Sequence, residues 1–261
     1  MPNAIGEVMM QSFHLRPIGA SLFVWLALTG LAQAKCQDAP NPGVDWSGCA
    51  KTQLFLSNDD LTGANFSRAQ VSATDLTGSN LSGAKLSEAE MSRARFDGAN
   101  LAGADLTKAV GWRTNFQKAN LERANLTSAD LSRSNFAGAR LAGASLTKSE
   151  LNRSDFTGAD LSKVDLSRAE LARVVFAKAK LQGVNVSFSN LARARLEGLD
   201  LNGVNLTGAY LFLTQIAGTD LSATSGLKQD QIALACGDPR TKLPDGITAP
   251  KTWPCPSDEA D

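Results

Sequence analysis

A five-residue period in the apolar side chains constrains this sequence more than any other feature. Every fifth residue from Leu56 to Leu221 gives 34 positions, of which 33 are Leu, Phe, Val, Met or Ile and one is Gly111. A small or β-branched residue stands two positions before almost every centre, and Asp or Asn most often lies between, as in Ala104-Asp105-Leu106. An amphipathic helix repeats about every 3.6 residues and a strand about every 2.0, so neither explains this pattern. We therefore predict a solenoid of stacked five-residue units.

A slower period shows how these units stack. Five of the six Phe centres lie 20 residues apart, which puts four units in each turn: Phe96, Phe116, Phe136, Phe156 and Phe176. Sorting the residue two after each centre into four columns of period 20 supports this, because two columns hold Gly at 12 of 18 positions and the others hold one Gly in 16. The four faces of the predicted coil are therefore chemically distinct.

The A-(D/N)-L-x-x unit resembles the pentapeptide-repeat family. The resemblance implies an all-β fold, a right-handed quadrilateral β-helix with the central Leu or Phe and the preceding small residue facing inward. At four units per coil, the 34 units predict about 8.5 coils, and strands about 4.7 to 4.9 Å apart give a rod of roughly 40 Å. We expect the β-helix at 54–223, an N-terminal cap at 35–53, and a C-terminal cap and tail at 224–261.

The open ends of such a tube are exposed edges that need caps. The tail, with Ala235-Cys236-Gly237-Asp238 and later Trp253-Pro254-Cys255, resembles a terminal segment of some family members. We expect a short helix from Lys228 to Cys236, stopped by Gly237, and then a Pro-rich strap.

The N-terminus has the pattern of a signal peptide at 1–34. An apolar run of 14 residues, Ile18 to Leu31, precedes Ala32-Gln33-Ala34, which predicts cleavage before Lys35. The run is too short for a transmembrane anchor, so we expect a periplasmic or secreted protein. A buried N-terminal helix is the alternative. Cleavage would remove His14, the only histidine, and with it every His-dependent catalytic or zinc site.

All four cysteines follow the predicted cleavage site, and an even count suits an oxidising compartment. They are Cys36, Cys49, Cys236 and Cys255. Four cysteines allow three pairings, but a rod keeps its ends apart, which favours the local pairs Cys36 with Cys49 and Cys236 with Cys255. A four-thiolate zinc site would need all four together and lacks C-x-x-C spacing, so we predict no metal site.

One outward column holds six arginines at a strict 20-residue spacing: Arg93, Arg113, Arg133, Arg153, Arg173 and Arg193. Like charges about 5 Å apart repel, so something must compensate. One interpretation is a surface salt-bridge ladder with the acidic residues three positions earlier, namely Glu90, Asp130, Glu150 and Glu170. The other is an anion-binding track for a polysaccharide, a lipid headgroup or an acidic protein, since the Arg fork binds anions in bidentate fashion.

Two further features stand out on the predicted surface. Gly111 leaves a centre without a side chain, and we expect Trp112 or a shifted backbone to fill the space. Tyr210, Phe212 and Leu213 lie outward on the arginine face near its C-terminal end, with Phe188 on the neighbouring face. Such an apolar cluster can mark a partner contact, but we expect the C-terminal strap with Trp253 to cover it.

No catalytic motif or cofactor signature is present in the sequence. We therefore predict a non-catalytic structural or binding rod without cofactors, a monomer or dimer whose partner is an unknown protein or an anionic ligand. Nucleic acid is disfavoured, because 26 basic residues balance 26 acidic ones. The family resemblance implies one alternative, a DNA-mimicking, gyrase-binding protein of the quinolone-resistance type. Neutral charge and predicted export both oppose it.

Overall fold

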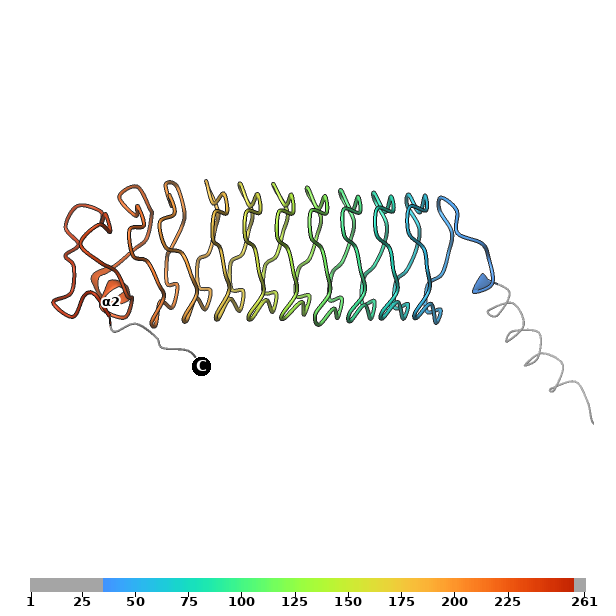
Figure 1. The fold of residues 1–261 in the computed structure, drawn as a ribbon, viewed down its shortest axis with the longest axis horizontal. Helices are drawn as coiled ribbons and strands as arrows, with labels where there is room; N and C mark the ends of the chain where they lie inside the picture. The colour runs from blue at the N-terminus through green and yellow to red at the C-terminus, as the bar shows by residue number, and fades with distance from the viewer. Residues whose placement is uncertain (1–34, 256–261) are drawn as a thin grey trace, which may run out of the picture. The chain divides into compact units, whose positions relative to one another are not determined.

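A computed structural model describes residues 35–255, and the chain from Asp38 onward forms one compact unit. Parallel β-bridges with a spacing of 20 residues run from Asp45↔Asn65 to Asn205↔Ser225, so the chain winds as a β-helix with four units per coil (Figure 1). The bridges begin at Asp45, before the predicted start at Leu54. The predicted signal peptide, 1–34, lies outside the described residues.

The backbone of each standard unit is held by an ordered set of hydrogen bonds. In the unit centred on Leu61, the first, third and fifth N–H groups donate to carbonyls of the neighbouring coils, and the fourth closes a turn onto the Leu61 carbonyl. The second N–H, of Thr62, donates to Oδ1 of Asp60 at 3.1 Å. All 20 Asp and Asn residues that precede a centre in the described coils accept this bond. The repeated Asp or Asn thus completes the backbone pairing of the unit.

Each corner of the coil requires a left-handed residue. The residue two after each centre has φ between 52° and 74° in every unit from Gly43 to Gly218, whether it is one of 15 glycines or one of 21 other residues. A left-handed backbone costs about 1 to 2 kcal/mol for a residue with a Cβ. The two glycine-rich columns therefore relieve strain, and the columns that lack glycine retain it.

The centres form a closely packed core. The rings from Phe96 to Phe176 stack coil upon coil, with centroids 4.6 to 5.6 Å apart. At Gly111, a Cβ would lie 2.7 Å from Leu131 Cδ2 and 2.8 Å from Met91 Cγ, so side chains of both adjacent coils fill the space. The expectation that Trp112 fills it is wrong, and Trp112 stays on the outside.

Trp46 closes the N-terminal end of the core. It occupies a centre, is 1% exposed and meets the Phe66 ring edge-on, with centroids 5.4 Å apart. Lys51 occupies the next centre and places Nζ 3.9 Å from the Trp46 ring centroid. Burial lowers the pKa of Lys51, and the nearby Asp38 charge opposes this shift in part.

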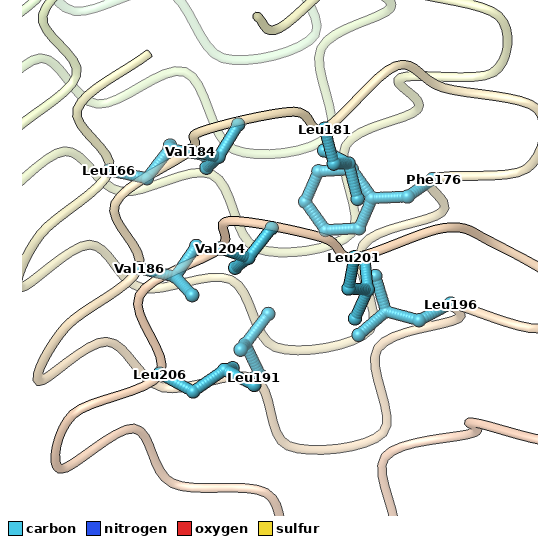
Figure 2. Close-up of a pocket in the computed structure, with 10 residues that line it drawn as sticks. All are labelled: Leu166, Phe176, Leu181, Val184, Val186, Leu191, Leu196, Leu201, Val204 and Leu206. Atoms are coloured by element: carbon cyan, nitrogen blue, oxygen red, sulfur yellow. The ribbon is translucent and has the colours of Figure 1, made fainter. Parts of the chain in front are cut away.

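The backbone ladder opens between 178–183 and 197–203. Among the described residues, the N–H groups of Leu181 and Gly183 have no acceptor in the next coil, whereas Leu161 and Lys163 one coil earlier make these bonds at 3.0 Å. An apolar pocket lies inside this opening, with ten lining residues that include Phe176 (Figure 2). We call this opening the seam.

An oversized inward residue accounts for the seam. Leu199 occupies the inward position two before a centre, where the five preceding coils, Ala99 to Ala179, carry Ala. Its side chain is 8% exposed, whereas Ala159 is fully buried. Extra methylene groups in a packed core force the backbone to move, so we infer that Leu199 holds the coils apart.

Replacing Leu199 with Ala should close the seam. We expect amide exchange at Leu181 and Gly183 to slow by at least about tenfold, equivalent to about 1.4 kcal/mol, because the missing inter-coil bonds can form. Hydrogen exchange followed by NMR measures this directly. Leu201→Ala is the control, because it shortens a side chain at a centre and leaves the large Leu199 side chain in place. Unchanged exchange in Leu199→Ala would show that another feature opens the coils.

Helix α2 (Gln229–Ile232) caps the C-terminal end (Figure 1). Its Gln231 Nε2 donates to the Leu206 and Ala209 carbonyls at 2.9 and 2.8 Å, which satisfies backbone at the open end of the tube. The helix is shorter than the predicted span from Lys228 to Cys236. Cys236 instead forms a bridge with Gln215 and so continues the coil.

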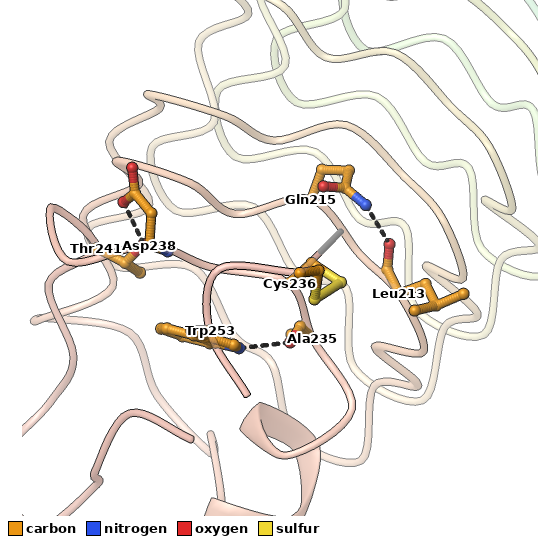
Figure 3. The surroundings of a disulfide bond; sticks show 8 residues. Leu213, Gln215, Ala235, Cys236, Asp238, Thr241 and Trp253 are labelled. Carbon is orange, nitrogen blue, oxygen red and sulfur yellow. Dashed lines mark hydrogen bonds between the residues drawn. A yellow bond between two sulfur atoms is a disulfide. The ribbon is translucent and has the colours of Figure 1, made fainter. Parts of the chain in front are cut away.

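A disulfide fastens the C-terminal strap, as the local pairing scheme predicts. Cys236 pairs with Cys255, and Trp253 Nε1 donates to the Ala235 carbonyl at 2.7 Å (Figure 3). Lys242 Nζ lies 2.8 Å from Asp220 Oδ2 and lowers the pKa of Asp220 to about 2. Cys36 and Cys49 are also disulfide-bonded, and their pairing with each other stays a prediction.

Candidate binding surface

The six predicted arginines lie on one corner of the coil, and we call them the arginine ladder. Each follows its centre by two residues, with φ between 57° and 62°, so each stands at a left-handed position that favours glycine. Successive members belong to adjacent coils, about 4.7 to 4.9 Å apart. The four from Arg93 to Arg153 are exposed, and Arg173 and Arg193 are half-buried.

The ladder arginines are not neutralised by neighbouring carboxylates. Within residues 35–255, no ladder side chain lies within 4.0 Å of a carboxylate oxygen, although other basic residues form such pairs, such as Arg68 with Glu88 at 2.9 Å. The predicted salt-bridge ladder is therefore wrong. Two of the four carboxylates have other partners: Asp130 accepts the Ser132 N–H at 3.1 Å, and Glu170 accepts Asn190 Nδ2 at 2.9 Å.

The same corner carries backbone donors without acceptors. The residue before the centre is Glu90, Val110 or Glu150 in three ladder units, so the Asp or Asn acceptor of the standard unit is missing. In the described structure, the N–H groups that follow these centres, in Ser92, Trp112 and Asn152, donate to no protein atom. Sequence analysis missed these donors, although the absent Asp or Asn was a visible signal for them.

Trp112 lies outside the core, among the ladder arginines. The guanidinium carbon of Arg113 is 4.3 Å from its ring centroid, and that of Arg133 is 5.5 Å away, so both form cation–π contacts. A shallow hollow extends from Trp112 toward the N-terminal end of the corner. It is lined by Thr52, Gln53, Ser72, Ala73, Ser92, Arg93 and Trp112.

Tyr210 and Phe212 continue this face toward the C-terminus. Their rings stack with centroids 6.1 Å apart, and the two residues are 48% and 40% exposed. Phe188, on the neighbouring face, is 61% exposed. The expectation that the strap covers this cluster is wrong, because Trp253 packs on Gly237, where a Cβ would lie 2.4 Å from its ring.

The described residues contain no group of three or more His, Cys, Asp or Glu side chains placed to hold a metal ion. In the same part of the chain, no helix has the length and apolarity needed to cross a membrane.

Comparison with protein families settles the classification. A model of pentapeptide repeats matches 52–78, 74–110, 89–133 and 189–225, and a model of the pentapeptide repeat region matches 129–206. The chain belongs to the pentapeptide-repeat family. The resemblance inferred from the sequence is therefore confirmed. No curated protein matches this pentapeptide-repeat chain.

Solved structures of other pentapeptide-repeat proteins are similar in fold. Full-length QnrB1, a plasmid-mediated fluoroquinolone resistance protein, is 19% identical, with 74% of this chain and 92% of QnrB1 covered and a TM-score of 0.48. HetL, involved in heterocyst differentiation regulation in a Nostoc cyanobacterium, is 27% identical, with 74% and 94% covered and a TM-score of 0.28. A thylakoid-lumen protein of Arabidopsis thaliana is 26% identical, with 45% and 77% covered and a TM-score of 0.30.

The left-handed position of the ladder can be tested through stability. We expect Arg153→Gly to be more stable than Arg153→Ala by about 1 kcal/mol, because both remove the side chain and only Gly relieves the strain. Denaturant unfolding of both variants gives the difference. Ser162 lies at an ordinary turn position, one residue before the left-handed residue. There we expect the opposite result, with Ser162→Ala more stable than Ser162→Gly. Equal stability of the two Arg153 variants would contradict a strained ladder.

Proposed function

We propose that this protein is a non-catalytic, exported rod that binds an anionic partner along the arginine ladder. The supporting observation is that none of the six arginines forms an ion pair with a carboxylate within the described structure, and all stand at backbone positions where glycine would be less strained. Solubility does not require Arg there, since Lys, Gln or Ser would serve as well. Guanidinium groups bind carboxylates and phosphates in bidentate fashion, which suits an anionic ligand.

The proposed location is the periplasm or the extracellular space. Two observations support it: the signal-peptide pattern that ends at Ala34, and a Cys236–Cys255 disulfide of the kind that persists in oxidising compartments. The proposed protein is a monomer or dimer and needs no cofactor.

The DNA-mimicking, gyrase-binding role is the alternative in this family. A DNA mimic must present acidic groups in place of phosphates, whereas the ladder presents arginines and the chain as a whole has as many basic as acidic residues. Export would also separate the protein from a cytoplasmic gyrase. We therefore place the anion-binding role first.

Binding of a generic polyanion tests the proposed function. The chain from Lys35 onward is titrated with dextran sulfate at low salt, and Arg133, Arg153 and Arg173 are changed together to Gln. We expect the affinity to fall by at least about tenfold, because each variant site loses a charge that faces the ligand.

A matched control is available on the other corners. Changing Arg123, Lys163 and Arg168 to Gln alters the net charge equally, at positions that share the left-handed backbone. This control should bind within about twofold of the parent protein. Equal weakening by both triple variants, or no binding by the parent protein, would contradict a role for the ladder.

A further inference from the structure

The ladder corner is not uniformly basic. Three exposed carboxylates, of Glu90, Glu150 and Glu170, lie beside it at the position before their centres. None of them forms an ion pair with a ladder arginine in the described structure. A ligand on this corner therefore meets cations on one side and hydrogen-bond acceptors on the other.

We propose that the ladder binds a linear polysaccharide with one carboxylate on each sugar, laid along the axis of the coil. This inference rests on the proposed function and names its ligand class. A uronic acid carries both groups that the corner requires, because its carboxylate suits the arginine fork and its hydroxyls donate to carboxylates such as Glu150. A polyanion without hydroxyl donors can bind the arginines but cannot donate hydrogen bonds to these carboxylates.

The spacing of the ladder fits the same class of polymer. Neighbouring arginines are separated by one strand spacing, about 4.7 to 4.9 Å. A linear sugar chain laid along the coil axis passes one coil after another, and the carboxylates on the side that faces the ladder can each meet a guanidinium group. The six arginines then define a site for six sugars.

Trp112 supplies an aromatic surface for the apolar face of a sugar, which the arginines alone do not provide. Its indole is not needed in the core, because Met91 and Leu131 fill the space at Gly111. Aromatic rings stack on the apolar faces of sugars, and the unpaired N–H groups of Ser92 and Asn152 are donors for ligand oxygens on the same corner. The hollow beyond Trp112 leads the bound chain past Arg93 onto the uncharged Gln53, Ser72 and Ala73.

Oligogalacturonates of defined length, from the disaccharide to the decasaccharide, are the probes for this proposal. Calorimetry with the chain from Lys35 onward, at low salt, should show the affinity rising up to the hexasaccharide and then levelling, because the ladder ends. The fully methyl-esterified hexasaccharide has the same backbone without charge. It should bind at least about tenfold more weakly.

Variants of Trp112 separate sugar recognition from charge attraction. Trp112→Ala should weaken hexagalacturonate binding by about tenfold and leave polyphosphate binding within about twofold, whereas Trp112→Phe should restore most of the sugar affinity. The variant Arg133→Gln, Arg153→Gln, Arg173→Gln should weaken both ligands. Trp112 is half-buried and its ring contacts Arg113 and Arg133, so unfolding curves of its variants are recorded to confirm that they are folded under the binding conditions.

The outcomes distinguish the two proposals. If polyphosphate or single-stranded DNA binds as tightly as hexagalacturonate, or if Trp112→Ala weakens all polyanions equally, polysaccharide recognition is overturned and the anion-binding function stands. If galacturonates bind with no dependence on length, the ladder is not a linear track and the inference also fails. If no polyanion binds, both proposals fall.

Discussion

In every unit whose centre is preceded by Asp or Asn, one hydrogen bond from the N–H after the centre to that side chain completes the pairing of the backbone. The other four N–H groups of a standard unit are satisfied by adjacent coils and by the turn, as the unit of Leu61 illustrates. The side chain of Asp60 supplies the fifth acceptor. A unit in which every N–H group has an acceptor can repeat without interruption, which suits a sequence that keeps its frame through 34 centres.

The same constraint determines which positions of the unit have a structural role and which can vary. Inward residues are committed to packing, and Asp or Asn is committed to the backbone. The corner residues remain free to vary. On the ladder corner, Glu90, Val110 and Glu150 replace the usual acceptor, so backbone donors and arginines are exposed together. The corner where we propose binding therefore lacks the usual Asp or Asn in these three units.

The sequence predicted the repeat, its four-unit coil and the arginine column, because each follows from strict periodicity. It did not predict effects that depend on contact between coils. Leu199 looks like one more apolar residue, yet it lies where the bonds between two coils are missing. The predicted pairing of arginines with acidic residues is absent, and two of those acidic residues, Asp130 and Glu170, accept hydrogen bonds from other groups. The helix at Gln229–Ile232 ends early because Cys236 joins the coil.

Amide hydrogen exchange tests the backbone constraint most directly. After correction for intrinsic rates, the N–H groups of Ala137 and Ser167, which donate to Asn135 and Asp165 at 2.9 Å, should exchange at least about tenfold more slowly than that of Trp112, which has no protein acceptor in the described structure. Changing Asn135 to Ala should bring Ala137 to the rate of Trp112 while the inter-coil amides stay protected. Equal rates for Ala137, Ser167 and Trp112 in the parent protein would contradict the proposed role of the repeated Asp or Asn.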